Sequence, residues 1–264
     1  SAFYRMTIAA VLFLPYVIIF KRFKKIPGRL FLLSMLCGVL FGTDISIWNI
    51  AIQKSTATQA TLLSNLTPVW VGISSLLFMR DKPTVNFWIG TFIALFGMIL
   101  LVGFKIFKNL ELDLPFWFAI ISGIIYAAYI LISKKVLSQV DVITFITISM
   151  VSSSLYLGLV SYVINEPFWG FSNEGWCVLI IQGVVCQLLA WLLISYATQH
   201  IRATRVSLSL LGQALLASLL AWLFLDETIT FQMTIGGIFM LLGIRVTFYS
   251  KQISFYLFKR NWSN

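Results

Sequence analysis

Charge is scarce in this sequence, and so are the residues that hold metals. Only 11% of the 264 residues are charged, and the chain has one histidine, His200, and three cysteines. A soluble domain carries about 25% charged residues, so a soluble fold is excluded. The cysteines lie within or at the edge of apolar runs without metal-ligand spacing, which predicts free, packed thiols. We therefore expect no metal site and no cofactor, and the sequence lacks the clustered groups that an integral-membrane enzyme needs.

Long apolar runs take the place of charge. Hydrophobic residues make up 59% of the sequence, and the mean hydropathy is +0.94. About 20 consecutive apolar residues span a bilayer as an α-helix. Runs of that kind, joined by short links, predict nine membrane helices at residues 3–20, 30–51, 58–79, 85–104, 114–133, 142–164, 176–198, 204–225 and 230–249. The expected fold class is therefore all-α integral membrane, in a multi-pass protein of the cell membrane.

The basic residues lie in the links between these runs. The net charge of +10 is therefore a topology signal, and we expect no nucleic-acid partner. All lysines and arginines except Arg5, Lys54, Lys105 and Lys108 fall in alternate links and at the C-terminal end, on one side of the membrane. The positive-inside rule assigns that side to the cytoplasm. Residues 251–264 mix aromatic and basic side chains, which suits either a cytoplasmic interfacial segment or a frayed terminus.

One stretch of the sequence occurs twice. Ala57–Gly97 aligns without a gap with Ala203–Gly243, and each copy has an apolar helix, a polar turn with an acidic residue, and a second apolar helix with two glycines. The two turns fall on opposite sides of the predicted membrane, so the copies are inverted, as is typical of transporters. We expect a first half at residues 1–108 with four helices, a second, inverted half at 109–250 with five, and a tail at 251–264. The unequal count predicts a ten-helix inverted 5+5 repeat that lacks its first helix here.

Three segments carry a family resemblance. They are Ala2–Arg5, Thr58–Pro68 and Leu223–Thr228, and their order is as informative as their residues. Together they resemble the drug/metabolite transporter superfamily, in its EamA-type branch, and the likeness extends over nearly the whole chain. The resemblance implies ten helices in two inverted five-helix halves with a central cavity, and the export of amino acids or other small metabolites. The absent first helix, which helps to wall the cavity in the family, is the departure from that pattern.

Asp44 is the acidic residue that lies well inside an apolar run. At about 1.5 Å per residue it lies roughly 15 Å from Lys54, deep in the predicted membrane. A charge at that depth costs about 2.5–3.5 kcal/mol on insertion scales, so such residues are candidates for function. Asp44 could take up a coupling proton, pair with a cationic substrate group, or make a structural hydrogen bond to a neighbouring helix. Trp48 lies four residues later, on the same helix face.

Polar and aromatic residues recur on later helices. Pro68 has no amide hydrogen and frees the carbonyl of Ser64, close to Asn65, as in the helix breaks of transporters, although a kink without a ligand role is a competing explanation. Amide and aromatic groups suit a pocket for a small polar or zwitterionic solute, and interhelical packing competes with that interpretation for each residue. The candidate substrate-binding residues are Asp44, Trp48, Asn65, Tyr126, Gln187, Trp191 and Gln213.

The sequence favours a secondary transporter, an exporter of a small metabolite such as an amino acid, that works by alternating access. Its expected partners are a small-molecule substrate, with proton coupling at Asp44 as one option, and membrane lipids. A flippase for lipids or lipid-linked precursors shares the fold, and lateral openings with a basic cytoplasmic rim would favour it. An integral-membrane enzyme is the third interpretation, against which the scarcity of catalytic groups counts.

Overall fold

The computed structural model describes residues 2–54, 57–79, 82–103, 113–164, 170–225 and 228–249, which are helical without any β-strand. The elements are α1 (Ala2–Ile19), α2 (Gly28–Lys54), α3 (Ala57–Ser64), α4 (Thr67–Phe78), α5 (Val85–Val102), α7 (Leu114–Leu137), α8 (Val142–Val163), α9 (Asn173–Ile181), the π-helical η1 (Gln182–Leu189), α10 (Ala190–His200), α11 (Ala203–Ser209), the 3-10 turn η2 (Leu210–Gly212), α12 (Gln213–Leu225) and α13 (Phe231–Phe248). The acidic turn residues Asp81, Asp226 and Glu227 and the predicted tail at 251–264 lie outside the described residues.

Nine segments of the described chain are long and apolar enough to cross a membrane. They are Ala2–Ile19, Gly28–Lys54, Gln59–Phe78, Val85–Val102, Leu114–Leu137, Val142–Val163, Asn173–His200, Ala203–Phe224 and Phe231–Phe248. Each agrees with a predicted run to within a few residues, so the prediction of an all-α, multi-pass membrane protein is confirmed. Large apolar side chains such as Phe78, Phe92 and Phe231 are exposed, as expected of a surface that faces lipid.

Three of these spans are not continuous α-helices. The third span is divided between α3 and α4 at Asn65 and Leu66, the seventh contains η1, and the eighth contains η2. Only the first of these irregularities lies beside a proline, Pro68, which the sequence singled out. The other two have no proline to mark them in the sequence.

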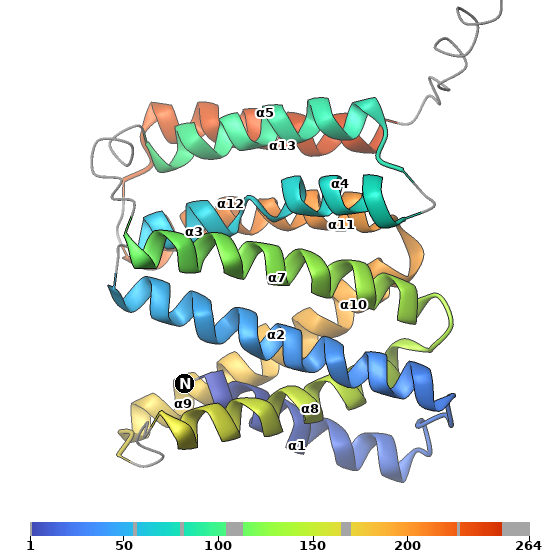
Figure 1. The fold of residues 1–264 in the computed structure, drawn as a ribbon. Coiled ribbons are helices and arrows are strands. Elements are labelled where there is room, and N and C mark those ends of the chain that lie inside the picture. Colours follow the sequence, from blue (N-terminus) through green and yellow to red (C-terminus); the bar gives the residue numbers. More distant parts are fainter. Residues whose placement is uncertain are drawn as a thin grey trace, which may run out of the picture.

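The helices lie side by side and run between two ends of the molecule, where the links gather (Figure 1). Helices α5 and α13 pack on each other at one edge, and α1, α8 and α9 lie at the opposite edge. Between these edges α2 packs along α7, and α7 also contacts α3, α4 and α11. The interior of the bundle is therefore built from helices that come from all parts of the described chain.

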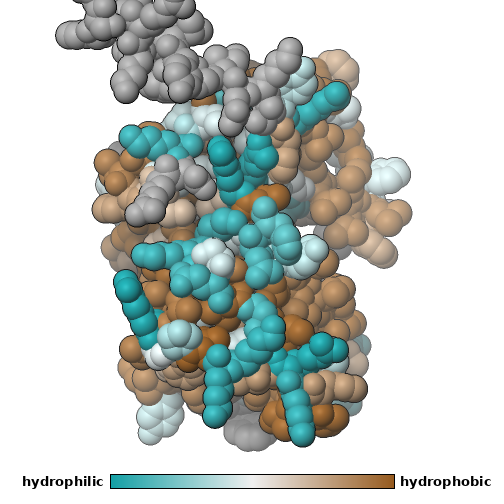
Figure 2. Space-filling view, turned by 90° about the vertical axis from the view of Figure 1, so that its right-hand side faces the viewer, coloured by the Kyte–Doolittle hydropathy of each residue, from teal (hydrophilic) through white to brown (hydrophobic). Residues whose placement is uncertain are grey.

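Hydrophilic side chains gather at one end of the molecule, where the links from α1 to α2, from α7 to α8 and from α10 to α11 lie (Figures 1 and 2). Lys24 and Asp141 form an ion pair of 3.8 Å at this end. Lys134 donates hydrogen bonds to the carbonyl oxygens of Thr198 and Gln199 at 2.9 and 3.0 Å, and it thereby satisfies carbonyls that the end of α10 leaves free. The charge pattern of the sequence predicts that this end faces the cytoplasm.

Several helices begin at a capping side chain. In each, an oxygen of a Ser, Thr or Asp side chain accepts a hydrogen bond from the amide three residues later, which satisfies a donor that the first turn leaves free. The pairs are Thr84 with Phe87, Asp113 with Phe116, Asp141 with Thr144, Ser172 with Gly175, and Thr230 with Met233. Thr84 and Thr230 occupy the same place in the two copies of the repeat, so the last helix of each copy starts in the same way.

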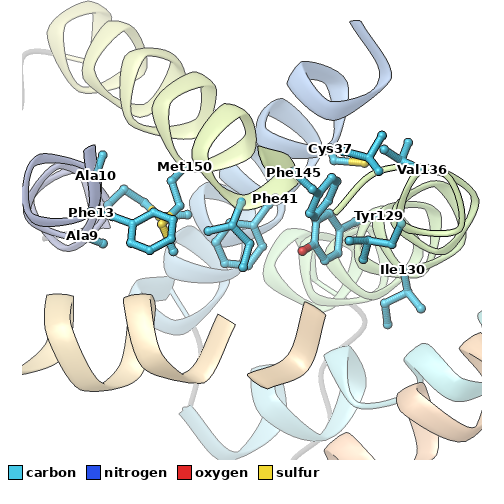
Figure 3. Close-up of a cluster of buried hydrophobic side chains, with 14 of the residues drawn as sticks. Ala9, Ala10, Phe13, Cys37, Phe41, Tyr129, Ile130, Val136, Phe145 and Met150 are labelled. Carbon is cyan, nitrogen blue, oxygen red and sulfur yellow. The ribbon is translucent and has the colours of Figure 1, made fainter. Parts of the chain in front are cut away.

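The largest buried cluster lies where α1, α2, α7 and α8 meet (Figure 3). Phe13 of α1, Phe41 of α2, Tyr129 of α7 and Met150 of α8 are all buried in it. The rings of Phe41 and Tyr129 are 5.6 Å apart, within the range of favourable aromatic pairs. Cys37 is packed in this cluster as predicted, whereas the other two cysteines are free thiols with exposed side chains.

Helices α5 and α13 touch backbone to backbone at four glycines, which we call the glycine seam. A Cβ atom on Gly97 would lie 2.5 Å from the carbonyl oxygen of Gly236, and a Cβ on Gly243 would lie 2.5 Å from that of Gly90. Glycine is required at such positions because close packing, and not the removal of apolar surface from water, holds membrane helices together. The contacts are crossed, since the first glycine of each repeat copy meets the second glycine of the other.

The helix bounds repeat with the same spacing as the sequence. A shift of α5 by 146 residues gives the bounds of α13. The same shift moves α2 to residues 174–200, and α9, η1 and α10 together span 173–200. The same shift moves the break at 65–66 to 211–212, inside η2. Both copies therefore contain an interrupted helix that is followed by an uninterrupted helix of 18 residues.

Candidate functional site

A cavity of about 190 Å³ lies beside the interrupted parts of the third and eighth spans. It is lined by Phe41, Asp44, Trp48, Thr61, Ser64, Asn65, Thr67, Pro68, Ser122, Gly123, Tyr126, Trp191, Ser207, Leu210, Leu211 and Gln213. A cavity of about 150 Å³ in another protein is large enough to bind benzene. The space therefore suits a compact organic solute.

The cavity brings together six of the seven residues that the sequence analysis selected. Asp44, Trp48, Asn65, Tyr126, Trp191 and Gln213 line it, from four different helices and one helix break. Gln187 does not line it and is buried within η1. Spacing of i and i+4 predicted that Gln187 shares a face with Trp191, but the wider turn of a π-helix changes that angular offset.

Sequence reasoning missed two hydroxyl groups that the second half of the chain contributes to the lining, those of Ser122 and Ser207. Ser122 lies four residues before Tyr126, and that spacing, which places both on one face of α7, is a signal that could have found it. Ser207 of α11 donates a hydrogen bond to the carbonyl oxygen of Thr204 at 3.0 Å. A serine that is satisfied within its own helix carries no sequence signal for a site.

Asp44 and Ser122 link α2 to α7 at the cavity wall. The Ser122 hydroxyl donates a hydrogen bond of 2.5 Å to Oδ1 of Asp44, and the Ser122 side chain is itself buried. Among the described residues, no lysine or arginine lies within ion-pair distance of the Asp44 carboxyl, since the one ion pair there joins Lys24 and Asp141. A short bond from a hydroxyl to a carboxyl fixes the orientation of Asp44. It supplies no counter-charge.

An aromatic wall stands next to this carboxyl. The ring of Trp191 stacks on those of Tyr126 and Tyr129, with centroids 6.4 and 5.9 Å apart and interplanar angles of 15° and 23°. Phe41 meets Trp191 edge-on at 4.5 Å. These contacts join α2, α7 and α10 through rigid side chains, so the wall is positioned before any solute enters.

The break between α3 and α4 is held by side-chain hydrogen bonds. Pro68 cannot donate to the carbonyl oxygen of Ser64, and the Thr67 hydroxyl donates to that oxygen instead, at 2.7 Å. The same hydroxyl lies 3.2 Å from the carbonyl oxygen of Gly123 on α7. A Cβ on Gly123 would lie 2.9 Å from the Ser64 oxygen, so glycine is needed for α7 to approach the break. The break is thus stabilised from two sides and forms a fixed part of the cavity.

Asn65 and Gln213 connect the two interrupted spans. The Gln213 amide donates to Oδ1 of Asn65 at 3.5 Å, the outer limit of a hydrogen bond. Asn65 is 8% exposed, and its Nδ2 is buried without a hydrogen-bond partner among the described residues. An unsatisfied buried donor costs about 1–3 kcal/mol. A solute with an acceptor group would remove that cost.

The chemistry available in the cavity is that of binding. The described residues contain no group of three or more His, Cys, Asp or Glu side chains that could hold a metal ion. The lining offers one carboxyl, several hydroxyls, two amides and aromatic faces. Such a mixture orients a solute within a largely apolar wall.

A family model, several sequence relatives and a solved structure all match this chain. A model of the EamA-like transporter family matches residues 1–103 and 114–249. An uncharacterized transporter of Archaeoglobus fulgidus is 25% identical over 254 residues, which cover 93% of this chain and 86% of that protein. The S-adenosylmethionine uptake transporter of Rickettsia bellii is 21% identical over 166 residues, or 63% of this chain and 53% of that protein. A crystal structure matches with a TM-score of 0.78 and 15% identity, over 93% of this chain and 86% of the other.

Proposed function

The chain belongs to the EamA-like transporter family, and we propose that it is a secondary transporter of a small metabolite, such as an amino acid. Its two halves, residues 1–108 and the inverted residues 109–250, give alternating access to one central site. The observation that carries this proposal is the cavity, because both halves contribute to its lining. Asp44 and Asn65 belong to the first half, and Tyr126, Trp191 and Gln213 belong to the second.

Two contacts between the halves support a rocking movement. At the glycine seam the backbones of α5 and α13 are in direct contact, where Gly97 meets Gly236 and Gly90 meets Gly243, so we propose that this contact is the fixed axis. At the cavity, the hydrogen bond between Asn65 and Gln213 is long, and its loss costs little. In the rocking form of alternating access one repeat moves against the other, and we assign the lasting contact to the glycine seam and the separable contact to Asn65 and Gln213.

Export is the direction that we propose, on the basis of the family resemblance. The relative in Rickettsia bellii is named for uptake, so the assay must be sensitive to both directions. We also propose that a proton can couple to transport at Asp44, which is the charged side chain of the cavity.

Counterflow in proteoliposomes tests the proposal. Vesicles that hold the purified protein are loaded with a mixture of unlabelled amino acids and diluted into the same radiolabelled mixture, and exchange is measured without any imposed gradient. We expect uptake of label above that of protein-free vesicles. Absence of exchange, in protein that remains folded by its thermal unfolding curve, would count against the transport of amino acids.

A matched pair of variants links that exchange to the cavity. Trp191→Ala removes part of the aromatic wall, and we expect exchange to fall at least about tenfold, as is common when a large anchor in a binding pocket is truncated. Trp222→Ala makes the same chemical change at a side chain that is 52% exposed, and we expect exchange close to that of the parent. Equal effects of the two substitutions would place the route of the solute elsewhere.

A lipid flippase is the second candidate, and one feature favours it. A groove of about 490 Å³ at the hydrophilic end is lined by Arg22, by the ion pair of Lys24 and Asp141, and by apolar side chains that include Leu192 and Leu193. Cations beside an apolar wall suit an anionic lipid headgroup with its acyl chain. Loss of fluorescence of headgroup-labelled lipids after addition of an impermeant quencher separates the candidates. Full quenching in vesicles that contain the protein, against half in protein-free vesicles, would favour the flippase.

A further inference from the structure

The described lining of the cavity contains one carboxyl group, that of Asp44, and no lysine, arginine or histidine. The described hydrogen-bond partner of this carboxyl is the uncharged hydroxyl of Ser122. Two charges a few ångströms apart interact more strongly in a protein than in bulk water, because the effective dielectric constant is lower there. An anionic solute would therefore be repelled by an ionised Asp44, and a cationic solute would be attracted to it.

The aromatic wall favours the same kind of solute. Phe41, Tyr126 and Trp191 line the cavity together with Asp44. Aromatic faces attract cations, and quaternary ammonium ligands are bound by such faces in many proteins. The one contact between a cation and a ring among the described residues joins Arg205 to Phe248, at 5.4 Å, away from the cavity. The rings of the wall are therefore not already engaged by a cation of the described chain.

The cavity also has a neutral hydrogen-bonding region at the helix break. Nδ2 of Asn65 is buried and has no hydrogen-bond partner in the part of the chain that the structure describes, and the hydroxyl groups of Thr61 and Ser207 lie in the same lining. These groups suit a hydroxyl, carbonyl or amide group of a solute, because neither a lysine nor an arginine is present there to neutralise a full negative charge.

From these observations we infer that the solute carries a net positive charge. It is a compact amine or quaternary ammonium compound whose cationic group lies between the Asp44 carboxyl and the faces of Tyr126 and Trp191. A neutral polar group of the same solute reaches Asn65. This inference rests on the proposed transport function and specifies its substrate class.

A comparison of related solutes that carry different charges tests the inference on the parent protein. Choline and 3,3-dimethylbutan-1-ol have the same shape, and a carbon atom in the alcohol replaces the charged nitrogen. Leucinamide, leucine and N-acetylleucine form a second series with charges of about +1, 0 and −1 at neutral pH. Each compound is titrated in a thermal unfolding assay of the detergent-solubilised protein and as an inhibitor of amino-acid counterflow.

We expect choline to act at a concentration at least about tenfold below that of its neutral analogue, and leucinamide to act before leucine. N-acetylleucine should be the weakest member of its series. Equal potency within both series, or greater potency of the neutral or anionic members, would overturn the inference. Absence of any effect of the five compounds would overturn it too, whereas counterflow of amino acids would still stand and would support the transport function separately.

A variant pair assigns the selectivity to the cavity. Asp44→Asn keeps the shape of the side chain and an acceptor for Ser122 but removes the charge, and we expect choline and its neutral analogue to become equipotent. Glu174→Gln neutralises an exposed carboxyl at the start of α9, outside the lining, and should leave the preference for choline unchanged. Retention of that preference in Asp44→Asn would contradict the role of this carboxyl.

Discussion

Replacement of Gly97 by alanine tests whether the glycine seam holds α5 to α13. The new Cβ would lie 2.5 Å from the carbonyl oxygen of Gly236, 2.5 Å from the amide nitrogen of Met240 and 2.9 Å from Cβ of Phe239, whereas ordinary contacts begin at 3.4 Å. Two of these atoms belong to the backbone, so a side-chain rotation cannot relieve the overlap. The helices would have to separate by about 1 Å, which loosens the dispersion contacts along the whole interface.

The expected loss of stability is the difference between the cost of overpacking and the gain in helix propensity. Overpacking of a close-packed interior costs about 1–3 kcal/mol, and alanine regains about 1 kcal/mol relative to glycine through its helix propensity. The remainder is a loss of about 0–2 kcal/mol. In a chain of this size about 1 kcal/mol changes the unfolding temperature by about 2–4 °C, so we expect a decrease of up to about 8 °C.

Thermal unfolding of the purified protein in detergent measures this decrease. Gly28→Ala is the matched control, because a Cβ at Gly28 has no atom within 4 Å. Gly236→Ala should act like Gly97→Ala, since its Cβ would lie 2.5 Å from the amide nitrogen of Leu101. If both seam variants unfold at a higher temperature than the parent while Gly28→Ala does not, the helices are not held by close approach and the reasoning is refuted.

Membrane topology and proton coupling can each be checked with single substitutions. In a background without native cysteines, an impermeant thiol reagent added to intact cells should label Thr228→Cys and leave Lys24→Cys unlabelled, because the basic links are expected in the cytoplasm; the reverse pattern would overturn the topology and the inversion of the repeat. Asp44→Asn should unfold at the same temperature as the parent and lose the part of transport that depends on pH between mildly acidic and mildly alkaline conditions. Tyr126, the other titratable side chain in the described lining, is still present in this variant. A pH dependence equal to that of the parent would remove Asp44 from the proton pathway.

The spans and most of the site could be predicted because both depend on local sequence. Apolar runs interrupted by charge fix the helices, and a polar residue in such a run is costly enough to be noticed. Asp44 and Asn65 were found in this way, and Trp48 followed from helical spacing. These signals need no knowledge of which helices are neighbours.

The remainder depends on how the helices pack. Ser122 became part of the site only because α7 meets α2 in one register, and a serine in an apolar helix is ordinarily satisfied by its own backbone. Gln187 lies outside the described lining of the cavity, because the sequence of its segment contains no signal for the π-helical turn of η1. The interruption at η2 likewise has no proline to mark it. The sequence repeat does indicate its place, because the break at Asn65 corresponds to a position inside η2.

The glycine seam also provides a fixed frame of reference for measuring motion in this protein. Since the two backbones touch, the distance between α5 and α13 is set mainly by van der Waals contact between backbone atoms and less by side chains that can change rotamer. Spectroscopic labels at Phe92 and Leu241, whose side chains are 80% and 58% exposed, would serve as fiducial points on the two helices. A change in the distance from this pair to a label elsewhere in the chain can then be assigned to movement of the element that carries that label, because the two reference helices keep their separation.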